Sequence, residues 1–417
     1  MTTVSKPLVS VVVSTYAGER YLRRCLELLE GQTVSDRLEI LVIDSGSPEN
    51  EQSIVAEMQA THDNIVYVRT DRESLYEAWN RALALASGTY FANFNVDDWI
   101  RDDALELLMN ALEEHPDADI AYAHWAATTE AQQPPSATDP VSLHPPYEPV
   151  LPLFYCYGGS TQFWRRSSLL RLGGFDATYD ACGDLDALWR LTLAGGSAVL
   201  VPHVLEGFFQ NPDGISRATD IAMSEQSAIY VRARHETPLV SLYDIDPNDP
   251  AAVASAWTEL GNTAMHIKVP WHDGPLNDIV FALECYERAL TSLPTHRPAL
   301  HNRFVVLFDA GRWGEAEDSV DHLSETEAAF VRGSHLGLLS SGVAPAKRGA
   351  VYDAGIDRSR HRRVARVRPA DPVVVELAGA KEYVASLESH LQAGRDQMEV
   401  AQKYIASLES RIRTIDE

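Results

Sequence analysis

Residues 8–31 have the sequence LVSVVVSTYAGERYLRRCLELLEG, and this stretch decides the fold of the N-terminal half of the chain. Its first seven residues, LVSVVVS, form a β-branched run that is typical of a buried strand. The following residues place Leu22, Cys25, Leu26 and Leu29 at helical spacing before a closing glycine, Gly31. A buried strand followed directly by an amphipathic helix is one unit of an α/β sheet protein.

The same alternation of strand and helix continues to about residue 125. Predicted strands cover residues 38–44, 64–69, 89–95 and 119–125, and predicted helices cover residues 51–61, 74–87 and 102–115. Because helices separate the strands, the pattern predicts a parallel, doubly wound sheet with right-handed crossovers. Ligands of such sheets bind beyond the carboxyl ends of the strands, so polar residues at these ends are the first candidates for a site.

Short polar segments follow the first two predicted strands. In STYAGE, the ring of Tyr16 beside the hydroxyl of Thr15 suits stacking on a nucleobase while its edge or the ribose is contacted. The alternative is a ring that anchors the loop. In DSGS, Asp44 can accept a hydrogen bond from a base N–H or a ribose hydroxyl. A helix N-cap turn is the second interpretation, since Ser47 precedes the acidic segment PENE.

A pair of adjacent carboxylates, Asp97 and Asp98, follows the predicted strand at residues 89–95. Two exposed carboxylates at one strand end repel each other unless a cation lies between them. A hard divalent cation, Mg or Mn, that bridges to a diphosphate explains the pair. A loop or capping pair ahead of Arg101 and Asp102 is the alternative.

Together these stretches resemble the inverting GT-A glycosyltransferases of family two. The matching segments are VSVVVSTYAGERYLRRCLELLEGQT, LEILVIDSGSPENE, EAWNRALALASGTYFANFNVDD and GGFDATYDACGDLDALWRL, which keep the family's order within residues 8–215. The resemblance implies a Rossmann-like, nucleotide-sugar-binding GT-A domain over residues 1–235. It also implies one-step transfer that inverts the anomeric carbon with Mn or Mg.

The resemblance further implies roles for individual residues. Asp184 lies in the position of the family's "ED" motif, the general base, and Asp97 and Asp98 serve the ribose and the metal–diphosphate. The expected nucleotide contacts are Thr15, Tyr16, Glu19, Asp44, Ser45, Arg72, Asn95 and Asp97.

The chemistry of the transfer gives Asp184 an independent rationale. A sugar hydroxyl is a poor nucleophile, so a carboxylate must take its proton as the bond to carbon forms. Asp184 follows Gly183 and is expected in the loop, whereas Asp186 cannot face the same pocket on a regular helix; helix capping by Asp184 is the alternative. Asp186, Trp164 and Trp189 are candidate acceptor contacts, with core packing as the alternative for the two rings.

The chain departs from the family pattern at three places. Ser45 stands where the family often has a second aspartate that uridine-specific members use on the base. The donor therefore stays open between uridine, thymidine and guanosine diphosphate sugars. Asn95 replaces the first acid of D-x-D-D, and residues 208–216 contain no histidine for an extra metal ligand.

From about residue 236 the pattern changes to helices. Two stretches have the spacing of tetratricopeptide repeats, interrupted in the first by a segment with Pro270, Trp271 and Gly274. An unrelated helical hairpin is the alternative for this region, residues 236–330. The residues that carry the spacing are Trp257, Leu260, Gly261, Ala282, Tyr286, Ala289, Pro294, Leu300, Leu307, Gly311, Ala316 and Leu323.

The rest of the chain divides into a basic linker, residues 331–371, and a predicted coiled coil, residues 372–417. The linker is expected to be solvated, with contact to anionic lipid or to the acidic catalytic domain as alternatives. The coil has apolar residues at the a and d positions of about six heptads. These are Leu377, Val384, Leu391, Met398, Ile405 and Ile412 at a, with Ala380, Leu387, Gly394, Ala401, Leu408 and Ile415 at d.

Bulk composition excludes one class of partner. A net charge of −25 makes the chain a poor nucleic-acid binder, since phosphate contacts need clustered cations. The four cysteines lie without metal-ligand spacing, and residues 1–13 do not resemble a signal peptide. No apolar run approaches the length of a membrane span. A cytoplasmic protein is expected, with the inner face of the membrane as the alternative location.

The sequence therefore predicts a metal-dependent inverting glycosyltransferase, with hexosyl-type transfer, in the synthesis of bacterial surface polysaccharide or glycoconjugate. The acceptor is a glycan, a lipid-linked saccharide or a protein. One alternative is a non-catalytic nucleotide-sugar-binding scaffold. Another is a protein glycosyltransferase that recruits its acceptor through the helical repeats.

The predicted coil should make the chain a homo-oligomer through residues 377–415, most simply a parallel dimer, because one helix alone exposes its apolar seam to water. Gly394 and Ala401 weaken the centre of the seam, so the affinity is expected to be modest. Light scattering at tens of micromolar should give a larger mass for the full chain than for a chain ending at Ala370. Monomers in both samples, or the same oligomer in both, contradict the prediction.

Overall fold

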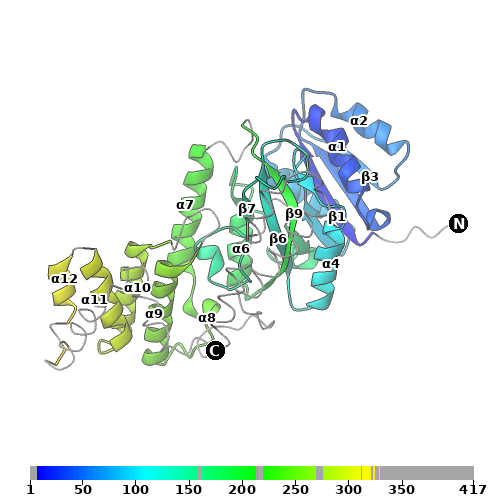
Figure 1. The fold of residues 1–417 in the computed structure, drawn as a ribbon. Helices are drawn as coiled ribbons and strands as arrows, with labels where there is room; N and C mark the ends of the chain where they lie inside the picture. Colours follow the sequence, from blue (N-terminus) through cyan, green and yellow to red (C-terminus); the bar gives the residue numbers. More distant parts are fainter. Residues whose placement is uncertain are drawn as a thin grey trace. The chain divides into compact units, whose positions relative to one another are not determined.

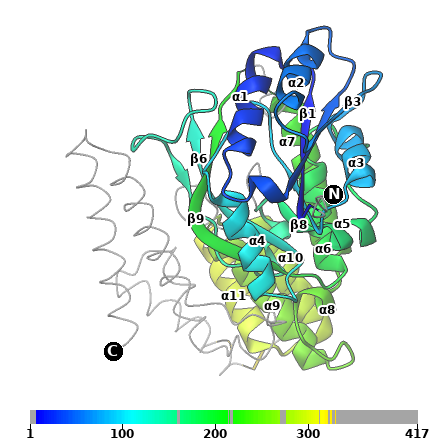
Figure 2. The same cartoon turned by 90° about the vertical axis from the view of Figure 1, so that its right-hand side faces the viewer.

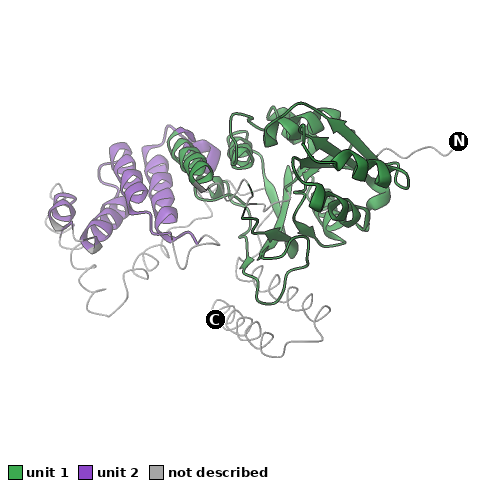
Figure 3. Cartoon of the chain, turned by 90° about the horizontal axis from the view of Figure 1, so that it is seen from above, with its two compact units in different colours: residues 1–235, 365–417 green, residues 236–364 purple. Residues whose placement is uncertain are grey.

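The computed structural model describes residues 7–157, 162–212, 214, 219–268, 276–310, 312–320, 323, 324 and 328. The described chain forms two compact units, the first ending at His235 and the second beginning at Glu236 (Figure 3). The predicted linker and coiled coil lie outside the described residues, as do Gly311 and the segment with Pro270, Trp271 and Gly274.

The first unit is built on one mixed sheet (Figure 1). Within the described residues the strand order is β3-β2-β1-β4-β8-β6-β9-β5, and β7 pairs with β6. The strands are β1 (Val9–Thr15), β2 (Leu38–Asp44), β3 (Ile65–Arg69), β4 (Tyr90–Asn93), β5 (Trp99–Ile100), β6 (Ile120–Thr128), β7 (Val141–Ser142), β8 (Phe163–Arg165) and β9 (Ala198–Phe209).

Helices cover both faces of this sheet (Figure 2). Side chains of β1 alternate between the faces, so Val9, Val11 and Val13 join residues of α1, α2 and α4 in one buried cluster. Helix α3 contacts β1 and β2 but contributes nothing to that cluster, which places it on the opposite face. The helices are α1 (Glu19–Glu30), α2 (Glu51–Gln59), α3 (Leu75–Leu85), α4 (Ala104–Glu114), α5 (Arg166–Arg171), α6 (Gly183–Leu193) and α7 (Thr219–Glu236).

The predicted parallel pairing is confirmed on one side of the sheet, whereas the other side is mixed and keeps parallel pairing only between β6 and β9. Strand β1 pairs in parallel with β2 and β4, and β2 pairs in parallel with β3. Strand β8 then lies between β4 and β6 and runs antiparallel to both, and β5 is antiparallel to β9. The alternation of helices and strands along the chain cannot reveal a strand that arrives later in the sequence and inserts between two earlier ones.

The second unit is helical over its described residues. Helices α9 and α10 pack against each other, and α11 contacts both of them. No helix among the described residues is long and apolar enough to cross a bilayer. The helices are α8 (Leu239–Leu242), α9 (Pro250–His266), α10 (Ile279–Ser292), α11 (Arg297–Asp309) and α12 (Trp313–Asp318).

Gly261 sets how closely α9 and α10 approach. A β-carbon at this position would lie 2.7 Å from Cε1 of Tyr286 and 3.1 Å from the carbonyl oxygen of Ala282. The Tyr286 hydroxyl donates to Oδ1 of Asn262 at 2.8 Å. The predicted helical character is confirmed here, while the assignment to tetratricopeptide repeats stays a prediction.

Two histidines are buried among the described residues of the first unit. The rings of His124, on β6, and His144 stack with centroids 6.4 Å apart, and His144 also stacks on Tyr155 at 5.9 Å. Nδ1 of His124 accepts a hydrogen bond from the backbone N–H of His144. Burial lowers the pKa of each imidazole to about 3, because the charged form would lose its hydration.

These histidines should make the fold less stable in mild acid. Below the ordinary pKa of 6.5 the unfolded chain takes up protons that the folded chain excludes until about pH 3. Each histidine should therefore lower the free energy of unfolding by about 1.4 kcal/mol per pH unit in this range. Urea unfolding at pH 7.5 and pH 5 should show a smaller loss for His144→Phe than for the wild type. An equal loss in both proteins contradicts the prediction.

Candidate active site

The carboxyl ends of three adjacent parallel strands meet at one edge of the sheet. Strand β1 lies between β2 and β4, with Thr15 opposite Asp44. The backbone N–H of Ser45 donates to the carbonyl of Thr15 at 3.1 Å. A β-carbon on Gly18 would lie 3.6 Å from Cγ1 of Val96, so the loop after β1 also touches the segment after β4. The three polar clusters that the sequence predicted therefore lie together.

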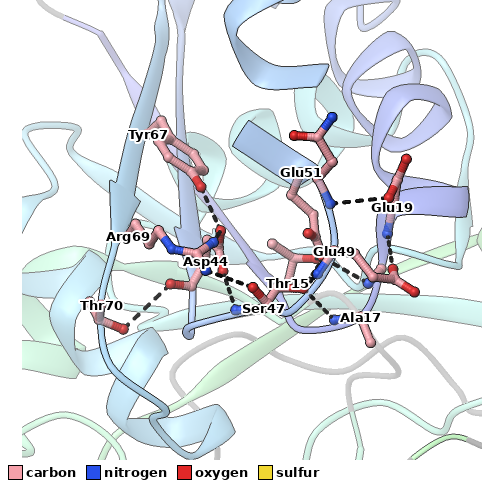
Figure 4. A network of polar contacts seen from close by, with 12 residues as sticks. Thr15, Ala17, Glu19, Asp44, Ser47, Glu49, Glu51, Tyr67, Arg69 and Thr70 are labelled. Atoms are coloured by element: carbon pink, nitrogen blue, oxygen red, sulfur yellow. Dashed lines mark hydrogen bonds and ion pairs between the residues drawn. The ribbon is translucent and has the colours of Figure 1, made fainter. Parts of the chain in front are cut away.

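A buried carboxylate, Glu51, holds the loop after β1 (Figure 4). Its Oε1 accepts from the Ser47 hydroxyl at 2.6 Å, from the Gly18 N–H at 2.9 Å and from the Thr15 hydroxyl at 3.5 Å. Ala17 has a φ of +53°, a left-handed conformation that favours glycine, and its N–H donates to the Ser47 hydroxyl. No sequence signal distinguishes Glu51, because an acid in the first turn of a helix also complements the helix dipole.

The N-terminus of α2 is capped differently from the prediction. Its N-cap residue is Asn50 rather than Ser47, and Asn50 makes no capping bond through its side chain. The backbone N–H of Asn50 donates to Glu19 at 3.1 Å, and the N–H of Glu19 donates to Glu49 at 3.0 Å. The Glu19 carboxylate, a predicted nucleotide contact, thus binds the start of α2.

Asp44 is fully buried and both of its carboxylate oxygens are bonded. Oδ2 accepts from the Tyr67 hydroxyl and from the Arg69 guanidinium, and Oδ1 accepts from the N–H of Ser47 at 2.7 Å. Burial and this bond to Asp44 raise the pKa of Tyr67 to about 12. Ser45 is buried as well. The side chain of Arg69 is 43% exposed, whereas that of Asp44 is shielded from solvent.

Two other predicted nucleotide residues, Tyr16 and Arg72, come together at the surface. The guanidinium carbon of Arg72 lies 3.7 Å from the centroid of the Tyr16 ring, and Tyr16 is 47% exposed. This is a cation–π contact on an accessible aromatic face. A planar base can stack here on the free side of the ring or in place of the guanidinium.

The two adjacent acids after β4 have different surroundings. Asp98 is buried, and its oxygens accept from the Phe209 N–H at 2.7 Å and from the Asn95 side chain at 3.0 Å. Burial and the nearby charge of Asp97 raise the pKa of Asp98 to about 8. Asp97 is only partly buried and accepts from the Asn211 side chain at 2.7 Å.

The contacts of these two acids explain why position 95 is an asparagine. They also indicate which acid could bind a metal. An aspartate at position 95 would face the Asp98 carboxylate, whereas the amide of Asn95 donates to it. Among the described residues no group of three or more His, Cys, Asp or Glu could hold a metal. Magnesium often takes one or two carboxylates and completes its shell with water and substrate phosphates. The partly exposed Asp97 fits such a site, and Asp98 supports its loop.

The carboxylate of Asp184 lies at the start of α6, in its first turn and not in the preceding loop. Its Oδ1 accepts from the Tyr76 hydroxyl at 3.2 Å, and the Cys156 thiol lies 3.9 Å from Oδ2. Removal from water raises the pKa of Asp184. A carboxylate with a raised pKa suits proton transfer near neutral pH.

Asp186 differs from Asp184 in its contacts. It is buried and pairs with Arg190 at 2.6 Å, and Arg190 also donates to the carbonyls of Leu172 and Gly174. Asp186 thus fixes α6 to the preceding turn, and its predicted contact with the acceptor stays a prediction.

Contacts through two residues of α3 link Asp184 to the end of β1. Tyr76 packs edge-on against Trp79 with ring centroids 5.2 Å apart, and the Trp79 indole N–H donates to the Ser14 hydroxyl near the end of β1. Two other candidates are not at this edge surface: Trp164 and Trp189 are buried, which favours core packing over stacking on a sugar.

Comparison with known proteins finds a family that resembles part of the first unit. Residues 10–172 match the family described as glycosyl transferase family 2. This part of the first unit is therefore similar to glycosyl transferase family 2.

Individual relatives match about a quarter to a third of this chain. The glycosyltransferase GlyA of Streptococcus pneumoniae is 32% identical over 124 residues, 30% of this chain and 18% of that protein. Chondroitin synthase of Escherichia coli is 32% identical over 104 residues, 25% of this chain and 15% of that protein. This chain thus spans less than a fifth of the length of either relative.

Solved structures give more distant alignments. TarS of S. aureus, residues 1–349 in complex with UDP, aligns with a TM-score of 0.46 at 14% identity and covers 78% of this chain and 92% of that chain. The mannosyltransferase PcManGT from Pyrobaculum calidifontis, in complex with GDP-Man and Mn2+, gives a TM-score of 0.40 at 17% identity and covers 84% and 88%.

Proposed function

We propose that this chain is an inverting glycosyltransferase that moves a sugar from a nucleotide diphosphate donor to an acceptor hydroxyl, in the synthesis of a bacterial surface polysaccharide or glycoconjugate. The observation that carries the proposal is the match of residues 10–172 to glycosyl transferase family 2. The positions of Tyr16 and Asp97 after β1 and β4 support it, as does the link from Asp184 to β1 through Tyr76 and Trp79.

The donor would bind across the ends of β1, β2 and β4. Its base would stack at Tyr16 and Arg72, where an aromatic face and a cation lie at the surface. Its diphosphate would lie near Asp97, which would hold Mg2+ or Mn2+. Such a cation, when bound, neutralises the charge that develops on the leaving diphosphate.

Asp184 would act on the acceptor. The acceptor oxygen attacks the anomeric carbon from the face opposite the diphosphate, the carbon–phosphate-oxygen bond breaks, and the acceptor proton passes to the Asp184 carboxylate. The raised pKa of Asp184 makes it a stronger base than an exposed aspartate. The hydrogen bond from Tyr76 to Oδ1 fixes the direction of the carboxylate, and the acceptor would meet Oδ2, which lies 3.9 Å from the Cys156 thiol.

The proposed donor site predicts that a nucleoside diphosphate binds in a metal-dependent way. Calorimetry with UDP, GDP and dTDP should give at least one nucleotide that binds about tenfold or more tightly with Mn2+ than with chelator, because one carboxylate and the diphosphate share the cation. Asp97→Ala and Asp98→Ala should lose this difference, and Asp102→Asn, at an exposed neighbouring site, should keep it. Equal affinity with and without metal, or undiminished dependence in Asp98→Ala, is the contrary outcome.

The proposed role of Asp184 predicts that substitution of the two acids of α6, Asp184 and Asp186, has different effects. Asp184→Asn should lower kcat about 10²–10⁴-fold and leave donor affinity unchanged, because a base acts only as the acceptor proton moves. Asp186→Asn should instead lower the free energy of unfolding by about 1–3 kcal/mol, since Arg190 loses its charged partner. Steady-state kinetics and urea unfolding measure the two effects. A folded Asp186→Asn variant that is inactive beside an active Asp184→Asn would reverse the assignment.

A further inference from the structure

Helix α7 provides a carboxylate that binds the backbone just before Asp184. Glu225 accepts hydrogen bonds from three consecutive N–H groups, those of Asp180 at 2.7 Å, Ala181 at 2.9 Å and Cys182 at 3.0 Å. Cys182 is the N-cap residue of α6 and makes no capping bond through its own side chain. Glu225 therefore bonds the segment that leads into α6 from another helix.

This contact has a clear physical basis. The N-terminus of a helix carries unsatisfied N–H donors and a partial positive charge, so it favours a carboxylate. Hydrogen bonds to an ionised acceptor are roughly twice as strong as neutral ones. Three such bonds to one carboxylate restrain the backbone of residues 180–182, and Asp184 lies two residues further on.

The same face of α7 makes further contacts with this segment. The Cys182 thiol donates to the carbonyl of Ala222 at 3.4 Å, and the buried Ile229 packs against Cys182 and Leu185. Ala222 and Ile229 lie three and four residues from Glu225, so all three share one side of the helix.

A second contact restrains the segment from the side of α3. A β-carbon on Gly183 would lie 2.9 Å from the Tyr76 ring, so the backbone at Gly183 rests directly on that ring. The hydroxyl of the same Tyr76 bonds to Asp184. The start of α6 is thus clamped between α7, through Glu225, and α3, through Tyr76.

We propose that Glu225 is a positioning residue for the reaction: by holding residues 180–182 it fixes the start of α6 and with it the direction of the Asp184 carboxylate. The proposal rests on the proposed function, in which Asp184 is the base. Glu225 itself reaches backbone N–H groups and takes no proton from the acceptor. Misplacement of a reacting group by about 1 Å can cost about 10²-fold in rate, which sets the size of the expected effect.

The experiment compares the wild-type full chain with Glu225→Ala, Glu225→Gln and a charge-matched control on the same helix, the exposed Asp220→Asn. Amide hydrogen exchange is followed in peptides that contain residues 180–186. Steady-state kinetics use the nucleotide sugar that the wild type turns over. Binding of the matching nucleoside diphosphate with Mn2+ is measured by calorimetry.

Glu225→Ala should speed exchange in residues 180–186 about tenfold or more, because the restraining bonds are lost, with strand β1 unchanged. It should lower kcat about 10²-fold with the donor KM and nucleotide affinity within about twofold. Glu225→Gln keeps one oxygen acceptor and should fall between Glu225→Ala and the wild type; it carries the test if the alanine variant does not fold. Asp220→Asn should match the wild type.

Unchanged exchange in the Glu225 variants overturns the proposal, whatever the activity. Faster exchange with unchanged kcat overturns it as well, because the restraint would not serve Asp184. Asp184→Asn, measured beside them, distinguishes a failure of the proposed base from a failure of the proposed positioning role. If that variant keeps full kcat, the assignment of the base fails. If it is inactive while Glu225→Ala keeps full kcat, only the positioning role fails.

Discussion

The parallel pairing of β1 with β2 on one side and β4 on the other is the constraint on which the rest of the site depends. It sets Thr15 opposite Asp44 and brings the loop of residues 15–18 against Val96. In a parallel sheet every strand end of this kind lies at the same edge, so polar residues that are distant in sequence become neighbours. The strand interiors, which are buried on both faces, supply the stability that holds these ends in place.

Burial divides the acids at this edge into two groups. Asp44, Glu51 and Asp98 are buried, and each is bonded: Asp44 to Arg69, Glu51 to Ser47 and Gly18, and Asp98 to Phe209 and Asn95. A buried carboxylate without such partners would cost several kcal/mol. These three acids therefore stabilise the loops at this edge of the sheet. Asp97 and Asp184 remain partly exposed and can meet a ligand.

The surroundings of Asp184 come from three parts of the chain. Tyr76 on α3 bonds to the carboxylate, Cys156 lies beside its other oxygen, and Glu225 on α7 holds the preceding backbone. The carboxylate is thereby kept partly out of water, which raises its pKa. A base that is oriented before the acceptor arrives needs less rearrangement during the transfer.

Local sequence by itself determined the main strands and helices up to about residue 125, but not the short strand β5, because the period of apolar residues and the glycine and capping signals act over a few residues. It also identified which strand ends carry acids. Tertiary structure alone decided the rest: the antiparallel insertion of β8, the division between Asp98 and Asp97, the pairing of Asp186 with Arg190, and the contacts of Glu51 and Glu225. Each of these depends on burial or on a partner far away in sequence, and a short pattern contains neither.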